Sequence, residues 1–288
     1  MSAEIVYLNG EFLPAEKASV SVLDRGFIFG DGVYEVIPVY GGRLFRLDEH
    51  LKRLTDSLSS VQIKNPLSIS QWRDVIIELV ARNGGGDLSI YLQVTRGVAT
   101  RDHAFPVNVP STLFLMANPL KAMSDEVHKK GVAAVTAEDI RWKYCHIKSI
   151  SLLGHVMLRQ QALDQNASEA ILIRDGHITE GAASNVFIVK NGELITPPKS
   201  DFLLPGITRD LVLEIAATHH IPFKEANFTP QVLSDADEVW LTSSTKEILP
   251  VTLLDGFPVG CGKPDILWQR MIALYQEYKQ NIRKNLSH

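Results

Sequence analysis

The sequence predicts an α+β fold with more than one domain, and three observations support this. The chain has 288 residues, of which 45% are hydrophobic, which is enough for a sizeable core and more than one domain. Short β-type runs are joined by Asn-Gly, Gly-Gly and Asp-Gly pairs, which are typical of antiparallel hairpins. Amphipathic helical patterns lie between these hairpins, which favours a mixture of hairpins and helices over one doubly wound parallel sheet.

The first half begins with two predicted hairpins. Residues 4–14 carry Asn9-Gly10 between apolar runs, and residues 32–47 carry Gly41-Gly42. Residues 48–61 are predicted to form a helix, because leucines recur on one face and Asp48 is placed to cap the first turn.

A second helix is predicted over residues 68–83, because the glycine run 84–86 would end it. Strands follow at 88–97 and 111–119. The pattern then breaks in a polar stretch, so we expect an N-terminal domain at 1–118, a linker at 119–123 and a C-terminal domain at 124–288.

The second half mixes strands, hairpins and helices. Its expected strands include residues 141–148, and the helix after them, 151–165, carries an apolar stripe of Leu152, Leu153, Val156 and Met157. The other expected elements are strands at 132–139 and 236–242, hairpins at 169–181 and 184–197, and helices at 208–220 and 266–282.

Composition limits the classes of function. The net charge is −4 and no basic block or basic helix face occurs, so nucleic acid is not an expected partner. The two cysteines, Cys145 and Cys261, lie far apart, which indicates a reducing compartment. No signal peptide or membrane-spanning run is evident, so we expect a cytoplasmic protein that has no membrane partner.

The stretch RWKYCHIKS, residues 141–149, carries the first candidate for chemistry. On a strand, Trp142, Tyr144, His146 and Lys148 would share one face. A buried ammonium group is costly unless it is paired or neutralised. Lys148 therefore either reaches solvent at the strand end or serves as a lysine of lowered pKa that forms a Schiff base.

Three further motifs supply complementary groups. In ITEGAASN, residues 178–185, Glu180 is either a solvated carboxylate or the partner of a protonated ring nitrogen. In LLPGITRD, residues 203–210, a helix is expected to start near Thr208. The Thr208 hydroxyl there would either cap the helix or bind phosphate. In LTSSTKE, residues 241–247, the three adjacent hydroxyls of Ser243, Ser244 and Thr245 either form a turn or contact phosphate. Together they match pyridoxal 5'-phosphate, which needs an amine, an acid and phosphate donors; no metal ion is expected.

The motifs resemble one known family in the right order. DRGFIFGDGVYEV, EHLKRL, QVTRGVATRDHAFP, EDIRWKYCHIKS, ITEGAASNVF, LPGITRD and LTSSTKEILPV are similar to those of D-amino-acid aminotransferases, members of the fold-type IV group of pyridoxal-phosphate enzymes. The resemblance covers nearly the whole chain. It implies a smaller N-terminal α/β domain and a larger C-terminal domain with a hairpin-rich, barrel-like sheet.

The resemblance also implies a role for each matching residue. Lys148 would carry the cofactor as an internal aldimine and move the substrate proton in a ping-pong transamination between D-amino acids and 2-oxo acids. Glu180 would pair with the pyridinium nitrogen. The phosphate would be bound by Arg53, Ile207, Thr208, Ser243 and Ser244, and Leu204 would lie against the cofactor. Tyr34, Arg101 and His103 would bind the substrate carboxylate.

The Arg101–His103 pair has a physical basis beside the resemblance. In an extended loop, residues i and i+2 point the same way, so both side chains could meet one carboxylate. In the family these two residues come from the partner subunit, which implies a homodimer.

The sequence departs from the family pattern at three positions. Ala182 and Ala183 stand where the family has serines, so a hydroxyl near the cofactor is missing, and Ser244 stands in place of threonine.

Other functions remain open at this point. A branched-chain L-amino-acid aminotransferase shares the fold, the lysine and the glutamate, but the RDHAF motif is not expected there. An (R)-amine transaminase and an aminodeoxychorismate lyase use the same scaffold. A non-enzymatic binding domain is disfavoured, because Lys148, Glu180 and Arg53 are all present.

Overall fold

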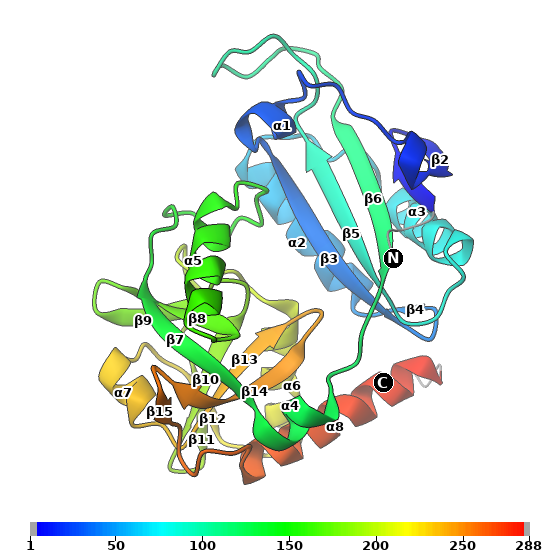
Figure 1. The fold of residues 1–288 in the computed structure, drawn as a ribbon. Helices are drawn as coiled ribbons and strands as arrows, with labels where there is room; N and C mark the ends of the chain where they lie inside the picture. The colour runs from blue at the N-terminus through cyan, green and yellow to red at the C-terminus, as the bar shows by residue number, and fades with distance from the viewer. Residues whose placement is uncertain (1–4, 285–288) are drawn as a thin grey trace. The chain divides into compact units, whose positions relative to one another are not determined.

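The computed structural model describes residues 5–284, which form two compact units (Figure 1). Of the described residues, unit 1 contains 5–121, Ile147–Leu152 and 282–284. Unit 2 contains Ala122–His146 and Leu153–Asn281. The segment that carries Lys148 is thus grouped with unit 1, although the division expected from the sequence places it in the C-terminal domain. The expected linker at 119–123 stays a prediction.

Unit 1 is built on a six-stranded antiparallel sheet with the order β2-β1-β6-β5-β3-β4. Two helices, α2 and α3, pack against it and share its apolar core. The strands are β1 (Ile5–Leu8), β2 (Glu11–Pro14), β3 (Gly32–Tyr40), β4 (Arg43–Leu44), β5 (Leu88–Thr95) and β6 (Thr112–Pro119). The helices are the 3-10 turn η1 (Ala15–Lys17), α1 (Arg25–Phe29), α2 (Leu47–Ser60) and α3 (Ile69–Arg82).

The two helices of this core begin differently. The Ser68 hydroxyl and the Gln71 side chain form a capping box at the start of α3. The expected cap of α2 is wrong: Arg46, with φ at 52°, precedes the helix, and Asp48 lies inside the first turn. There its carboxylate still interacts favourably with the helix dipole.

Unit 2 is built on a mixed nine-stranded sheet with the order β12-β11-β10-β13-β14-β7-β8-β9, with β15 paired to β14. Its strands are β7 (Val132–Glu138), β8 (Glu169–Arg174), β9 (His177–Gly181), β10 (Asn185–Lys190), β11 (Glu193–Thr196), β12 (Phe223–Glu225), β13 (Glu238–Ser243), β14 (Glu247–Leu254) and β15 (Phe257–Pro258). Both hairpins expected from Asp175-Gly176 and Asn191-Gly192 form, with positive φ at all four residues.

This sheet curls, as its connectivity requires. Five strand-to-strand steps separate β9 from β10 along the sheet, which is about 24 Å if the sheet were flat. Only residues 182–184 join the two strands, and that link reaches at most about 14 Å from Gly181 to Asn185. The sheet must therefore bend round on itself, and the expected α+β class with a barrel-like, hairpin-rich second sheet is confirmed.

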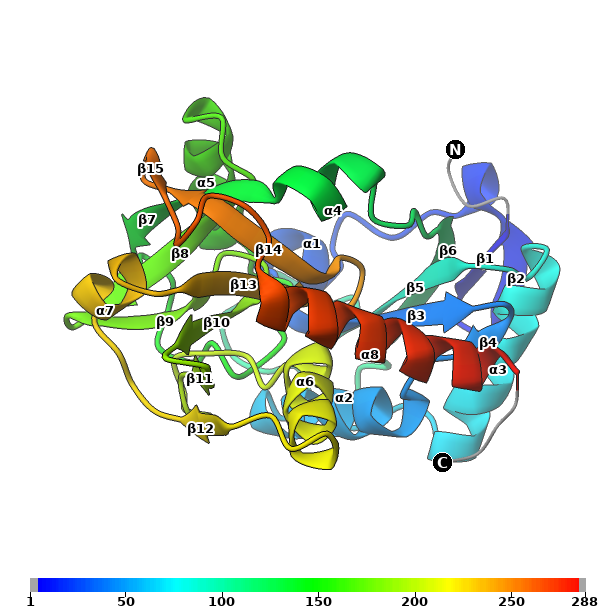
Figure 2. The ribbon, with the colours of Figure 1, turned by 90° about the horizontal axis from the view of Figure 1, so that it is seen from below.

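The helices of unit 2 are α4 (Asp125–Lys130), α5 (Leu153–Asp164), α6 (Ile207–Thr218), α7 (Pro230–Ser234) and α8 (Ile266–Arg283), the last two residues of which are grouped with unit 1. Helix α6 packs against β13 (Figure 2). At the start of α8, the Trp268 indole donates a hydrogen bond to the Ile248 carbonyl. None of the helices within residues 5–284 is long and apolar enough to cross a membrane.

Two expectations for the second half of the chain are wrong. Residues 141–148 form bends and turns, not a strand, although the Tyr144 ring still packs edge-on against Trp142 and His146. The expected apolar stripe is not buried as a unit: Leu152 lies before α5 and is half-buried, whereas Leu153, Val156 and Met157 are 73%, 62% and 55% exposed. The helix instead buries Leu158 and Ala162.

Candidate active site

Lys148 is held in unit 1 by its main chain. Its carbonyl accepts a hydrogen bond from the Tyr34 N–H at 2.9 Å, and its own N–H donates to the Ser57 hydroxyl of α2 at 3.3 Å. Next to it, Ser149 forms a bridge with Val33 of β3. The segment therefore lies along β3, which fixes the position of Lys148 without a strand of its own.

The side chain of Lys148 meets the side chain of Tyr34. The ammonium nitrogen Nζ lies 4.2 Å from the centroid of the Tyr34 ring, a cation–π contact. Within residues 5–284, Lys148 makes no ion pair. Its amine is thus not tied to a carboxylate, which leaves it available as a nucleophile once it loses a proton.

Arg53 lies in a buried cluster with two residues that the sequence did not single out. Its Nε and Nη2 donate to the two oxygens of Glu35 at 2.7 and 2.8 Å, and His50 Nδ1 lies 2.8 Å from Glu35 Oε2. Burial raises the pKa of Glu35, but the charge and hydrogen bonds of Arg53, with His50, outweigh this effect and hold the pKa well below its usual range. The sequence does contain a hint of this cluster, because Glu35 is a carboxylate within an otherwise apolar predicted strand.

Arg101 and His103 lie in the exposed loop between β5 and β6 (Figure 1). Both contact the Phe29 ring: the Arg101 guanidinium carbon and the His103 ring centroid each lie 5.4 Å from its centroid. The two side chains thus share one aromatic support.

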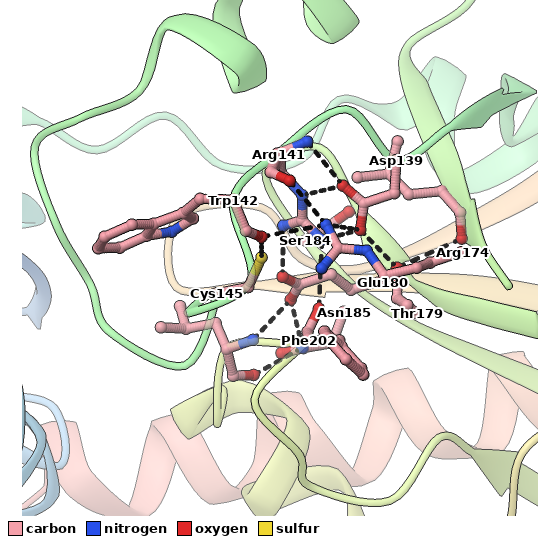
Figure 3. A network of polar contacts seen from close by, with 12 residues as sticks. Asp139, Arg141, Trp142, Cys145, Arg174, Thr179, Glu180, Ser184, Asn185 and Phe202 are labelled. Atoms are coloured by element: carbon pink, nitrogen blue, oxygen red, sulfur yellow. Dashed lines mark hydrogen bonds and ion pairs between the residues drawn. The ribbon is translucent and has the colours of Figure 1, made fainter.

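Glu180 lies in unit 2 at the centre of a polar network (Figure 3). Its carboxylate is buried in β9, where Oε1 accepts a hydrogen bond from Arg141 Nη1 at 2.6 Å. Oε2 accepts hydrogen bonds from the Asn185 amide at 3.1 Å and from the Leu204 N–H at 3.0 Å. The structure therefore brings Glu180 and Leu204 together and adds Arg141 and Asn185, which the sequence did not indicate as site residues.

Arg141 is itself fixed by Asp139. Nε and Nη2 of Arg141 donate to the two oxygens of Asp139 at 2.8 and 2.9 Å, and Arg174 approaches the same carboxylate at 3.1 Å (Figure 3). Burial raises the pKa of Glu180 to about 7, even though the neighbouring Arg141 lowers it. The carboxyl thus titrates near neutral pH, as expected of a group that works with a proton.

The start of α6 offers backbone donors. Gly206 precedes the helix, and no side chain caps it; Ile207 and Thr208 form the buried first turn. A Cβ at position 206 would lie 1.9 Å from Asn185 Oδ1, so any other residue would displace the Asn185 side chain from its hydrogen bonds to Glu180 and Leu204. A helix start with uncapped N–H groups can bind an anion such as phosphate.

The hydroxyl-rich loop after β13 is partly engaged in its own turn. The Ser243 hydroxyl accepts a hydrogen bond from the Lys246 N–H at 3.3 Å, whereas Ser244 is half-buried. The sequence did not indicate Thr242, whose buried hydroxyl has no hydrogen-bond partner within residues 5–284. Thr242 pairs with Asn185 across the strands, so this hydroxyl lies beside the Glu180 network.

The two alanines at the expected serine positions have different surroundings. Ala182 is buried in an apolar cluster with Leu158, Ala162 and Ala170, whereas Ala183 is exposed. A methyl group therefore suits the site of Ala182.

The comparison with known proteins identifies the family. Residues 32–254 match the family described as amino-transferase class IV. The chain belongs to this family. Class IV aminotransferases use pyridoxal 5'-phosphate as cofactor, so this chain is a pyridoxal-phosphate-dependent transaminase acting on amino acids and 2-oxo acids.

Individual relatives of this class IV aminotransferase cover almost its whole length. A D-alanine aminotransferase of Staphylococcus haemolyticus is 42% identical over 274 residues, 95% of this chain and 97% of that protein. One from Bacillus licheniformis is 42% identical over 94% of this chain and 95% of its own. Among solved structures, the branched-chain amino acid aminotransferase of Escherichia coli has a TM-score of 0.91 at 27% identity, covering 96% of this chain and 94% of its own.

Proposed function

We propose that this enzyme transfers amino groups between D-amino acids and 2-oxo acids. The observation that carries the proposal is the 42% identity to D-alanine aminotransferases over nearly the full length of both chains. The branched-chain aminotransferases, at 27% identity, are more distant in sequence. The loop with Arg101 and His103 supports the same conclusion, because it offers two cationic or hydrogen-bonding groups for a carboxylate.

The residues present fit the cofactor. Glu180 is a buried carboxyl whose pKa of about 7 allows it to share a proton with a ring nitrogen. Lys148 supplies an amine that makes no ion pair with any residue from 5 to 284. For the phosphate we propose the start of α6, with Ile207 and Thr208, together with Arg53, Ser243 and Ser244, while Leu204 lies against the cofactor.

Bound pyridoxal phosphate supplies an aldehyde that condenses with amines and a ring that accepts electrons from the substrate Cα. Lys148 Nζ would take the proton from the substrate Cα and deliver it to C4' of the cofactor within the same half-reaction, and the second half-reaction would reverse these transfers. Tyr34, Arg101 and His103 bind the α-carboxylate and so fix which Cα–H faces Lys148. Glu180 holds a proton at the ring nitrogen.

A homodimer and a cytoplasmic location belong to the same proposal. The exposed apolar side chains of α5 support a contact with a second copy of the chain, because such surface is costly to leave in water. The cysteines Cys145 and Cys261 are both free thiols, which supports a reducing compartment.

The decisive experiment is a half-reaction followed in the visible spectrum. The purified enzyme with bound cofactor is mixed with D-alanine and, separately, with L-leucine. We expect the cofactor band to disappear with D-alanine only, and Lys148→Ala to lack both the band and turnover. Loss of the band with L-leucine only would assign the enzyme to the branched-chain function.

A further inference from the structure

A buried arginine holds the loop that carries Arg101 and His103. Arg25, in α1, is only 3% exposed, and its Nη1 donates to the carbonyl of Asp102 at 2.5 Å and to the carbonyl of Ala104 at 3.3 Å. These two carbonyls lie on either side of His103. Arg25 therefore fixes the main chain around His103, although 77 positions separate it from Asp102 in the sequence.

Arg25 is in turn anchored by a shared carboxylate. Its Nε donates to Asp31 Oδ2 at 2.7 Å, and Arg96 donates to both oxygens of Asp31 at 2.7 and 3.0 Å. Burial raises the pKa of Asp31, but its hydrogen bonds to Arg96 and Arg25 prevail and lower it. Asp31 is thus a stable anion that joins the two arginines.

Arg96 fixes the far end of the same loop. Its guanidinium lies 3.6 Å from the centroid of the Phe105 ring, and its Nη1 and Nη2 donate to the carbonyls of Gln62 and Val61 after α2. The loop is therefore attached to α1 through Arg25 and to the end of α2 through Arg96.

Phe29 completes the arrangement. The Arg25 guanidinium carbon lies 4.8 Å from the ring centroid of Phe29, the ring that also supports Arg101 and His103. The main chain on both sides of His103 and the ring beneath it are thus fixed by one buried cation.

We propose that Arg25, anchored by Asp31, is a positioning residue that preorganises Arg101 and His103 for the substrate carboxylate. The inference rests on the proposed function of the loop. An exposed loop that samples many conformations must be ordered when it binds, and this ordering weakens affinity. Because Arg25 and the loop belong to the same chain, the argument holds whichever subunit's substrate the loop serves.

The test compares Arg25→Gln with Arg25→Lys and a control. In the D-alanine half-reaction, Arg25→Gln should raise the half-saturating concentration about tenfold, which corresponds to about 1.4 kcal/mol, with little change in the limiting rate. Arg25→Lys, which keeps the charge, should recover part of the loss. Arg73→Gln removes an arginine whose partner, Asp48, lies on the surface, and should leave both quantities unchanged.

Two further readouts separate positioning from general destabilisation. Amide hydrogen exchange of residues 101–105 should become faster in Arg25→Gln, while exchange in the strands stays as it was. The effect of Arg25→Gln on half-saturation should shrink in an Arg101→Ala background, because the two residues act through one loop.

Each failure has its own meaning. If the unmodified enzyme does not react with D-alanine, the proposed function fails, whereas the exchange measurement still reports on the loop. If that enzyme reacts and Arg25→Gln leaves half-saturation unchanged or lowers only the limiting rate, the positioning role is refuted. Equal effects of Arg25→Gln in both backgrounds would also refute it.

Discussion

At the scale of single residues, the clearest example of competing effects is Glu180. Burial alone disfavours its anion, whereas Arg141 at 2.6 Å favours it, and the result is a pKa of about 7. Arg141 can act this way because Asp139 holds its guanidinium at two nitrogens. The charge state of Glu180 therefore depends on a residue that is not itself expected to touch the cofactor.

We predict that Arg141→Gln raises the pKa of Glu180 further above 7, because the favourable charge is lost while burial remains. The carboxyl would then be protonated at pH 7 and would pair poorly with a pyridinium nitrogen. The dissociation constant of pyridoxal phosphate, measured by absorbance titration, should increase by about tenfold per unit of pKa shift at pH 7. As the pH rises, the dissociation constants of the variant and the unmodified protein should become more similar.

The control for this experiment is Arg174→Gln. Arg174 contacts Asp139 at 3.1 Å and makes no hydrogen bond to Glu180. Arg174→Gln should therefore leave the pH dependence of cofactor binding nearly unchanged. An equal change in both variants would mean that the network acts only through general stability.

At the scale of elements, β3 serves two purposes because its side chains alternate. Tyr34 points to Lys148, whereas Glu35, the next residue, points to His50 and Arg53 of α2. A shift of one residue in the register of β3 would exchange these two faces. The long antiparallel pairing from Gly32 to Val39 with β5 fixes this register.

We predict that Glu35→Gln destabilises the protein by about 3–5 kcal/mol at pH 7, because Arg53 stays buried without its anion. The pKa of Glu35 is lower in the folded protein than its ordinary value of 4.5. Its contribution is therefore present above about pH 4.5 and is lost as the pH falls. Urea unfolding at pH 7 and pH 3 should show a difference between the two proteins that is smaller by about 2 kcal/mol at the lower pH.

Asp56→Asn provides the control for Glu35→Gln. Asp56 pairs with Lys52 on the surface of the same helix, with both side chains largely exposed. Asp56→Asn should therefore change the free energy of unfolding by less than about 1 kcal/mol. A loss for Glu35→Gln that is equally large at pH 3 would contradict the assignment of a lowered pKa.

Elements with a strong local pattern could be predicted from the sequence. The hairpins at Asn9-Gly10 and Asp175-Gly176 and the glycine stop after α3 all have local causes. The strand expected at residues 141–148 is wrong, because their aromatic content satisfies β propensity while their actual contacts come from distant segments, such as Arg141 with Glu180.

At the scale of the whole molecule, the site residues named from the sequence are those whose chemistry shows in short motifs. Their partners are separated from them by long stretches of chain: 39 positions from Arg141 to Glu180, and 77 from Arg25 to Asp102. No local pattern announces such pairs. The fold was therefore more predictable than the polar networks that hold the proposed site residues.

The exposed apolar side chains of α5 bear on the proposed homodimer. An amphipathic pattern predicts which face of a helix is buried, but it does not say what buries it. In α5, Leu153, Val156 and Met157 are exposed in the single chain. In the proposed dimer, a second copy of the chain would cover them.

We predict that the protein in solution has the mass of two chains and that Val156→Glu shifts it toward the mass of one. Because Val156 is 62% exposed, the substitution should not disturb the folded chain, so circular dichroism should be unchanged. D-alanine turnover should fall together with the dimer, because Arg101 and His103 would then lack the neighbouring subunit's cofactor. Ile77→Glu makes the same kind of change at a 51% exposed apolar position of α3, away from α5, and should keep the dimer. Light scattering over a range of concentrations measures both variants, and a single-chain mass for the unmodified protein, or a dimer that Val156→Glu leaves intact, would contradict α5 as the contact.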